Sequence, residues 1–200
     1  TTPDQQDVVE IAPDGAGGAF VSWQDHRDYF VNNHRRDIYL QHVTQDGQIP
    51  AGWSVDGIPV CAAIGEQWNA KVAEDGAGGV YVVWVDFRRD LSLDPTQSDS
   101  YAQHLTPQGT IVAGWPVDGL AVCTAPLTRG TISLLPDGEG GVFVLWIDSR
   151  DLASTGGDIY AQRLQGDGSL SPGWIADGMP VSRAPGNPLA SILPSAIAAD

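Results

Sequence analysis

Short hydrophobic runs separated by glycine-rich turns follow one another along the chain. The strongest run, V-Y-V-V-W-V-D-F-R from Val80 to Arg88, consists mainly of β-branched and aromatic residues, which favour β-strands. No segment of helical length places its apolar residues with the roughly 3.6-residue period of a helix. The pattern therefore predicts an all-β chain.

The order of strands and turns repeats about every 62 residues, which indicates a tandem-repeat protein. Two markers of the period are the first residue of D-G-x-G-G and the tryptophan of the next strand, each spaced by 61 and 62 residues. The markers are Asp14, Asp75 and Asp137, and Trp23, Trp84 and Trp146. We expect repeats at about residues 8–68, 69–130 and 131–193, and the first strand of a fourth repeat at about 194–200.

Each repeat contains four strand-like segments separated by turn residues. Four antiparallel strands repeated at a fixed period are typical of a β-propeller blade. In the second repeat the strongest strand is apolar on both faces, with Val80, Val82 and Trp84 on one face and Tyr81, Val83, Val85 and Phe87 on the other. A sheet with one face in water would alternate between apolar and polar residues. We therefore predict a β-propeller-like array of four-stranded antiparallel blades, each covered on both faces.

The first repeat departs from this pattern on one face of its second strand. That face reads Phe20, Ser22, Gln24 and His26. Three polar residues at alternating positions are typical of a face in contact with water. We therefore expect this face to meet solvent or a different neighbour, as in a terminal blade.

Three composite motifs link the repeats to a known family. They read D-G-x-G-G-x-x-V-x-W-x-D-x-R, D-I-Y-x-Q-x-L and G-W-x-x-x-G-x-P-V. Together they resemble a tandem-repeat β-propeller family of secreted and surface proteins of bacteria, over nearly the whole chain. The resemblance implies a propeller fold and an extracellular or cell-envelope location, and it implies little about activity.

The chain is strongly acidic, with 25 acidic against 10 basic residues and a net charge of −15. Such a chain repels phosphate backbones, so nucleic acid is not an expected partner. No apolar run is long enough to span a membrane. The acids are mostly Asp, which is frequent in turns, and we expect no cofactor. Calcium is the alternative, and its weak candidate ligands are Asp90, Asp94 and Asp99.

Alternate residues of a strand share a face, so the Trp-x-Asp-x-Arg motif places an aromatic ring, an acid and a base in one row. Pairing the second and third strands brings the arginine near a further Asp, and we predict a charged clamp of Asp, Arg and Asp. The predicted clamps are Asp25–Arg27–Asp37, Asp86–Arg88–Asp99 and Asp148–Arg150–Asp158. A substrate-binding acid–base cluster is the alternative, but a catalytic site would occur once rather than in every repeat.

The other polar motifs favour structural roles. D-G-A-G-G precedes a strand, so it predicts a turn and not a phosphate-binding loop. His42, His104 and Arg163 occupy equivalent positions, which indicates a basic strand residue and not a zinc ligand. Cys61 and Cys123 are also equivalent. Packed sheets lie roughly 10 Å apart, beyond the reach of a disulfide, so we predict two buried free thiols.

Two groups of residues are candidates for contacts with a partner. The first is the tryptophan of each G-W-x-x-D-G segment, which could pack between repeats or form a platform for a sugar ring. These tryptophans are Trp53, Trp115 and Trp174. The second is a loop of the first repeat, rich in aromatic, amide and basic side chains that suit protein or glycan contacts. It contains Tyr29, Phe30, Asn32, Asn33, His34, Arg35 and Arg36.

These features predict a non-catalytic, secreted or cell-surface module for protein recognition, adhesion or self-assembly. Its expected partners are a protein or glycan, a second copy of the chain, or further repeats of a longer chain. A glycan-binding lectin with one tryptophan per blade is one alternative. A polysaccharide-degrading enzyme is another, although the sequence offers no acid pair that occurs only once.

Overall fold

The computed structural model describes residues 5–28, 34–92, 94, 97–126, 128–151 and 157–182. Over these residues it contains twelve β-strands and no α-helix, which confirms the all-β prediction. No helix of the described chain is long and apolar enough to cross a membrane.

The strands form three successive sets of four. The first set is β1 (Gln6–Pro13), β2 (Ala19–Asp25), β3 (His34–Val43) and β4 (Ile58–Cys61). The second set is β5 (Gly65–Glu74), β6 (Val80–Asp86), β7 (Asp99–Leu105) and β8 (Leu120–Cys123). The third set is β9 (Thr128–Pro136), β10 (Val142–Asp148), β11 (Asp158–Leu164) and β12 (Met179–Ser182). Each set begins two to four residues before the expected repeat boundary, because its first strand extends further toward the N-terminus.

Within each set, consecutive strands pair antiparallel. A short parallel contact, in which His34 and Arg36 of β3 pair with Gly65 and Glu66 of β5, joins the first two sets into one eight-stranded sheet. The third set is a separate four-stranded sheet. The described strands do not close into a barrel or a ring.

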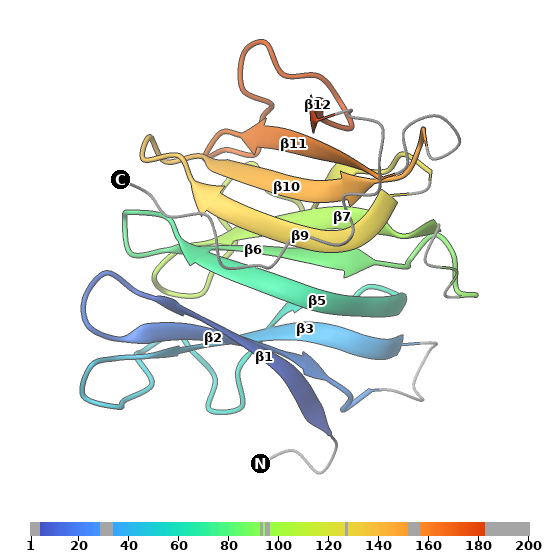
Figure 1. Ribbon diagram of the computed structural model, residues 1–200. Coiled ribbons are helices and arrows are strands. Elements are labelled where there is room, and N and C mark those ends of the chain that lie inside the picture. Colours follow the sequence, from blue (N-terminus) through green and yellow to red (C-terminus); the bar gives the residue numbers. More distant parts are fainter. Residues whose placement is uncertain are drawn as a thin grey trace.

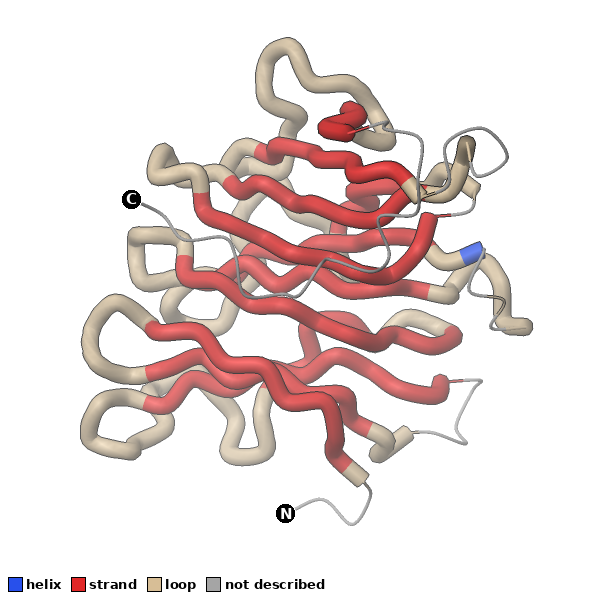
Figure 2. The backbone as a smooth tube through the Cα atoms, viewed as in Figure 1, coloured by secondary structure: helices blue, strands red, loops and turns tan. Residues whose placement is uncertain are grey.

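The three sets are stacked one upon another, and their first strands β1, β5 and β9 follow one another along one side of the stack (Figures 1 and 2). Two hydrophobic cores lie between the sets. One core combines Phe20, Ile38 and Leu40 of the first set with residues of β6. The other combines residues of β6 with β10 residues such as Val142 and Val144.

Strand β6 is buried along its whole length. Val80, Val82 and Trp84 belong to the core shared with the first set, whereas Tyr81 and its alternating neighbours belong to the core shared with the third set. The prediction that this strand is covered on both faces is confirmed. A strand in this position is apolar on both faces because neither face contacts water.

The expectation for the first set was wrong about which face is exposed. Ser22 and Gln24 are buried, and Phe20 on the same face packs against the second set. The Gln24 side chain replaces the missing apolar contacts with hydrogen bonds, since its Oε1 accepts from the Asn69 backbone N–H at 2.9 Å. The opposite face, which carries Trp23, lines an open cavity and has no neighbouring set among the described residues.

Each D-G-x-G-G segment forms a turn that is closed by its aspartate. Oδ1 of Asp14 accepts the backbone N–H groups of Ala16 and Gly18 at 2.8 Å each. Oδ2 of Asp14 lies 2.8 Å from Nε2 of His42 in β3. The second and third sets repeat the arrangement with the pairs Asp75–His104 and Asp137–Arg163. The basic strand residue therefore fastens the turn to the third strand of its set.

These contacts stabilise the ionised form of the turn aspartates. The hydrogen bond from His42 and the turn amides lower the pKa of Asp14. At Asp75 and Asp137, burial alone would raise the pKa, but hydrogen bonds from the turn amides and from His104 or Arg163 lower it. Each turn thus holds a carboxylate that is ionised at neutral pH.

Cys61 and Cys123 are buried free thiols, as predicted. Each lies at the end of the fourth strand of its set. Burial and the nearby Asp86 carboxylate raise the pKa of the Cys61 thiol. This environment favours an uncharged, unreactive sulfur.

Candidate functional site

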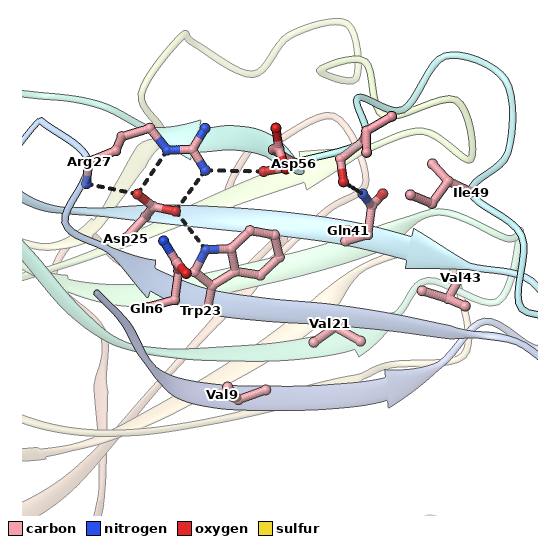
Figure 3. A pocket seen from close by; sticks show the side chains of 11 residues that line it. Gln6, Val9, Val21, Trp23, Asp25, Arg27, Gln41, Val43, Ile49 and Asp56 are labelled. Atoms are coloured by element: carbon pink, nitrogen blue, oxygen red, sulfur yellow. Dashed lines mark hydrogen bonds and ion pairs between the residues drawn. The ribbon is translucent and has the colours of Figure 1, made fainter. Parts of the chain in front are cut away.

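The Trp-x-Asp-x-Arg motif of the first set forms a compact cluster on the exposed face (Figure 3). Trp23 Nε1 donates to Asp25 Oδ2 at 2.8 Å. Arg27 donates through Nε to Asp25 Oδ1 at 2.8 Å and through Nη2 to Asp25 Oδ2 at 2.7 Å. Nη2 of Arg27 also reaches the backbone carbonyl of Asp56 at 3.1 Å, and the guanidinium lies 3.9 Å above the Tyr39 ring.

The Asp25 carboxylate is saturated with donors. Burial alone would raise its pKa, but the hydrogen bonds from Arg27 and Trp23 outweigh burial and lower the pKa. The hydrogen bond to Asp25 raises the pKa of Arg27. An acid in this state has no proton to donate at neutral pH, and its oxygen atoms are already occupied. The cluster is therefore suited to holding strands together and not to general acid catalysis.

The same cluster recurs in the other two sets with nearly identical geometry. Trp84 and Trp146 donate to their aspartates at 2.9 and 3.0 Å. Nη2 of Arg88 and Arg150 lies 2.7 and 2.6 Å from the same carboxylates. The two guanidinium groups lie 3.9 and 4.3 Å from the centres of the Tyr101 and Tyr160 rings. The arrangement belongs to the repeat and not to one place in the molecule.

The arginine contacts differ from the predicted clamp in their third member. Asp37 lies directly opposite Asp25 in the strand register, but Arg27 bonds to Asp25 and to the Asp56 carbonyl. In the second set Asp99 is hydrogen bonded to Arg89 and not to Arg88. In the third set Asp158 lies opposite Asp148, and Arg150 binds Asp148. The arginine thus joins the second strand to the turn before the fourth strand.

Sequence reasoning missed two residues that complete each cluster. The third strand of every repeat contains D-[IS]-Y-x-Q, at Asp37, Asp99 and Asp158. The glutamine of this motif donates to a backbone carbonyl of the Gly-Trp segment, as from Gln41 to Ser54 at 2.7 Å. Its counterparts Gln103 and Gln162 make the same bond at 2.8 Å each. The tyrosine of the motif stacks under the arginine. The recurrence of D-[IS]-Y-x-Q in all repeats was the signal for both roles.

A glycine of each G-W-x-x-D-G segment packs against the tryptophan ring of the cluster. A Cβ atom placed on Gly57 would lie 2.3 Å from Cη2 of Trp23. The same distance separates such an atom on Gly119 from Trp84, and on Gly178 from Trp146. Only glycine leaves room for the ring at this position.

The first set carries a cavity of about 450 Å³ over its cluster. Trp23, Asp25, Arg27 and Gln41 contribute to its wall (Figure 3). The other lining residues are Gln6, Val9, Val21, Val43, Ile49, Val55 and Asp56. In the second set the equivalent surface around Trp84 is covered by the first set. The cavity is thus the surface that a preceding set would cover.

The three tryptophans that were predicted as sugar platforms differ in their burial. Trp53 and Trp115 are buried, with 7% and 6% of their surface exposed. Their Nε1 atoms donate to the carbonyls of Pro107 and Gly166 in the next set, at 3.0 and 2.8 Å. These two rings are packed between sets and present no face to a sugar. Trp174 is half-buried and lies edge-on to Phe143, with ring centres 5.9 Å apart.

The predicted contact loop lies mostly outside the described residues. This applies to Tyr29, Phe30, Asn32 and Asn33, and His34 and Arg35 are described only as backbone of β3. Arg36 forms an ion pair with Glu66 at 2.8 Å, and it therefore links the first two sets.

The weak calcium candidates do not gather into one group. Asp90 Oδ1 accepts the Ser92 backbone N–H at 2.9 Å, Asp94 is exposed, and the Asp99 carboxylate is bound by Arg89. Within the described ranges, no three His, Cys, Asp or Glu side chains are placed to hold a metal ion together.

Comparison with known proteins gives matches among solved structures only. No protein-family model matches the chain, and no curated protein matches it. A solved structure of an endo-1,4-beta-xylanase from Bacteroides thetaiotaomicron VPI-5482 is similar with a TM-score of 0.45 and 12% sequence identity. The match covers 91% of this chain and 55% of that chain, so this chain spans about half the length of the xylanase.

Proposed function

We propose that the three sets are blades of a β-propeller-like array that serves as a non-catalytic module for protein recognition and assembly. The resemblance of its motifs to secreted and surface propeller proteins supports an extracellular or cell-envelope location. The stacking of four-stranded sheets with their first strands along one side supports the blade arrangement. The proposal requires no cofactor.

One observation carries the proposal. The cluster that most resembles an active site, Trp23 with Asp25 and Arg27, has counterparts in both other sets. The counterpart in the second set lies beneath the first set, where Trp84 is fully buried. Because the cluster of the second set packs against a protein sheet, the same surface in the first set is suited to contact with protein. The exposed copy therefore offers a recognition surface and not a reactive centre.

The experiment compares ligand classes on the purified chain. Surface plasmon resonance measures binding to proteins built from repeats with these motifs, and a glycan array measures binding to sugars. We expect binding to the repeat proteins that Val21→Asp abolishes and that free sugars leave unchanged. Val117→Asp is the matched control, because Val117 is exposed in a set whose two faces are both covered.

Two results would contradict the proposal. Saturable glycan binding that one free sugar competes, and that Trp174→Ala removes, would identify a lectin. Release of reducing ends from a polysaccharide by the purified chain, with retention of that activity in a second independent preparation, would identify an enzyme.

A further inference from the structure

The two ends of the stack expose apolar side chains at positions that are buried inside it. At the C-terminal end, Val181 of β12 is 62% exposed, whereas its equivalents Val60 and Val122 are each 3% exposed. At the N-terminal end, Val9 of β1 is 65% exposed, whereas its equivalent Ala70 is 1% exposed. Each end thus presents a surface of the kind that forms the internal boundaries.

The two end surfaces are different from each other. The N-terminal face carries Trp23 and Arg27, and its counterparts in the second and third sets receive the preceding set. The C-terminal face carries Phe143 and Trp174, and its counterparts in the first and second sets pack onto the following set. The N-terminal face is therefore complementary to the C-terminal face, as the facing surfaces of neighbouring sets are inside the chain.

Three polar contacts recur at both internal boundaries. A tryptophan N–H reaches a turn carbonyl of the next set, from Trp53 to Pro107 and from Trp115 to Gly166. The N–H after the last residue of the fourth strand reaches an aspartate of the next set, from Ala62 to Asp118 at 2.9 Å and from Thr124 to Asp177 at 2.7 Å. The cluster arginine of the next set reaches the cysteine sulfur, from Arg88 to Cys61 at 3.3 Å and from Arg150 to Cys123 at 3.6 Å.

We propose that the exposed N-terminal face binds the C-terminal face of a second copy of this chain, in a head-to-tail contact. This inference rests on the proposed function and names its partner. By equivalence of position, the Trp174 indole of one copy donates to the Gln45 carbonyl of the next copy. In the same contact, Arg27 of the next copy meets Ser182, which stands where the first two sets have cysteine.

The residues at this contact suit each other chemically. The Ser182 hydroxyl can accept a hydrogen bond from a guanidinium at least as well as a thiol does. The indole N–H of Trp174 has no hydrogen-bond partner among the residues that the structure describes, whereas those of the buried Trp53 and Trp115 each have one. In the second set, His104 lies 3.0 Å from the Gly166 carbonyl of the next set. Arg163 occupies the equivalent position in the third set, so its cation would face the acidic Gln45–Asp46 turn of the next copy. A contact between two different surfaces is heterologous, and it leads to rings or filaments and not to a symmetric dimer.

The test uses two variants that each block one end. Val9→Asp places a charge on the N-terminal face, and Val181→Asp places one on the C-terminal face. Both positions are exposed in the single chain, so we expect both variants to fold, as checked by circular dichroism. Val117→Asp is the control with a charge on neither end face.

Sedimentation velocity then separates the possibilities. We expect wild type and Val117→Asp to associate with increasing concentration, each blocked variant to remain a monomer alone, and an equal mixture of the two to form a one-to-one dimer. Only a head-to-tail contact gives that dimer, because each variant retains the surface that the other lacks. Wild type that stays monomeric up to about 1 mM, or blocked variants that fail to pair, would overturn the inference.

A second variant tests the register of the contact. Trp174→Phe keeps the aromatic ring and removes the N–H, so we expect association to weaken by about three- to tenfold. Unchanged association would overturn the predicted register. If the chain binds other repeat proteins but not itself, the proposed function stands and the second copy is wrong as its partner. If it binds a competable glycan instead, the proposed function itself fails.

Discussion

Nη2 of Arg88 lies 3.3 Å from Sγ of Cys61, although the two residues belong to different sets of strands. The same guanidinium binds Asp86 in its own strand and the Asp118 carbonyl in the turn before β8. The arginine therefore joins the second strand, the fourth-strand turn and the preceding set at a single point. The same contact occurs between Arg150 and Cys123, so it belongs to the repeat.

The two cysteines are predicted to resist modification until the sets separate. Burial raises the pKa of the Cys61 thiol, and the neighbouring Asp86 raises it further, so little thiolate is present at neutral pH. We expect Ellman's reagent to label neither thiol in the folded protein and both after denaturation. Fast labelling of one thiol in the native protein would show that its boundary between sets opens, contrary to the packing described above.

Gly119→Ala is predicted to destabilise the chain by about 2–4 kcal/mol, because the new methyl group would overlap the Trp84 ring. Gly76→Ala is a matched control. Gly76 has φ of +78° and no atom within 4 Å of its Cβ position, so this variant shows the effect of backbone conformation alone. Urea unfolding of both variants gives the difference. Equal losses would mean that the contact between Trp84 and Gly119 contributes nothing.

Ser22→Val is predicted to stabilise the chain by about 1 kcal/mol. The Ser22 hydroxyl is fully buried and has no hydrogen-bond partner within the described residues, and the equivalent residues are Val83 and Leu145. Ser22→Ala removes the hydroxyl without adding volume, so it separates loss of the polar group from gain of packing. A decrease in the midpoint of urea unfolding for both variants would show that the hydroxyl makes a stabilising contact.

Stability is predicted to fall as the pH drops below about 4. The pKa values of Asp14, Asp25, Asp75 and Asp137 are lowered in the folded chain. Each of these groups contributes stability above its unfolded pKa and loses it as the pH falls through its folded pKa. Burial raises the pKa of Asp99, which offsets part of the effect.

Asp75→Asn tests this pH dependence at one turn. The variant should be less stable than wild type at pH 7, because the amide loses the charge-assisted contact with His104. The difference should shrink as the pH falls below about 4, where the carboxylate becomes protonated first in the unfolded chain and then, because its pKa is lowered, in the folded chain. A difference in unfolding free energy that stays constant from pH 7 to pH 3 would contradict the assignment.

The sequence was sufficient to predict the period, the four strands of each repeat and the burial of β6, because all three depend on local residue patterns. It misled about the first set, where Ser22 and Gln24 suggested a face in contact with water. The direction in which sheets stack depends on how they twist and pack in three dimensions, and composition does not encode it. A polar residue such as Gln24 is buried without penalty when a backbone N–H, here that of Asn69, satisfies it.

Strand patterns also did not predict all side-chain contacts of the expected clamp. Strand pairing was expected to bring Asp37 near Arg27, and in the structure Asp37 lies opposite Asp25. The reach of Arg27 to the Asp56 carbonyl depends on the fold of the Gly-Trp segment, which no strand pattern predicts. Arg27 stacks on Tyr39, which pairs with Trp23 in the strand register, and the recurrence of this arginine and this tyrosine in every repeat was visible in the sequence.

The most direct test of the central claim is the thermal stability of Arg27→Ala measured alongside its binding. If the Trp-Asp-Arg cluster fastens the fold, the variant leaves the buried Asp25 unpaired and loses about 3 kcal/mol, which is a decrease of roughly 6–12 °C in Tm. The double variant Asp25→Asn/Arg27→Ala should recover part of this loss. A variant with unchanged Tm would contradict the account, because the cluster would then contribute nothing to the stability of the fold.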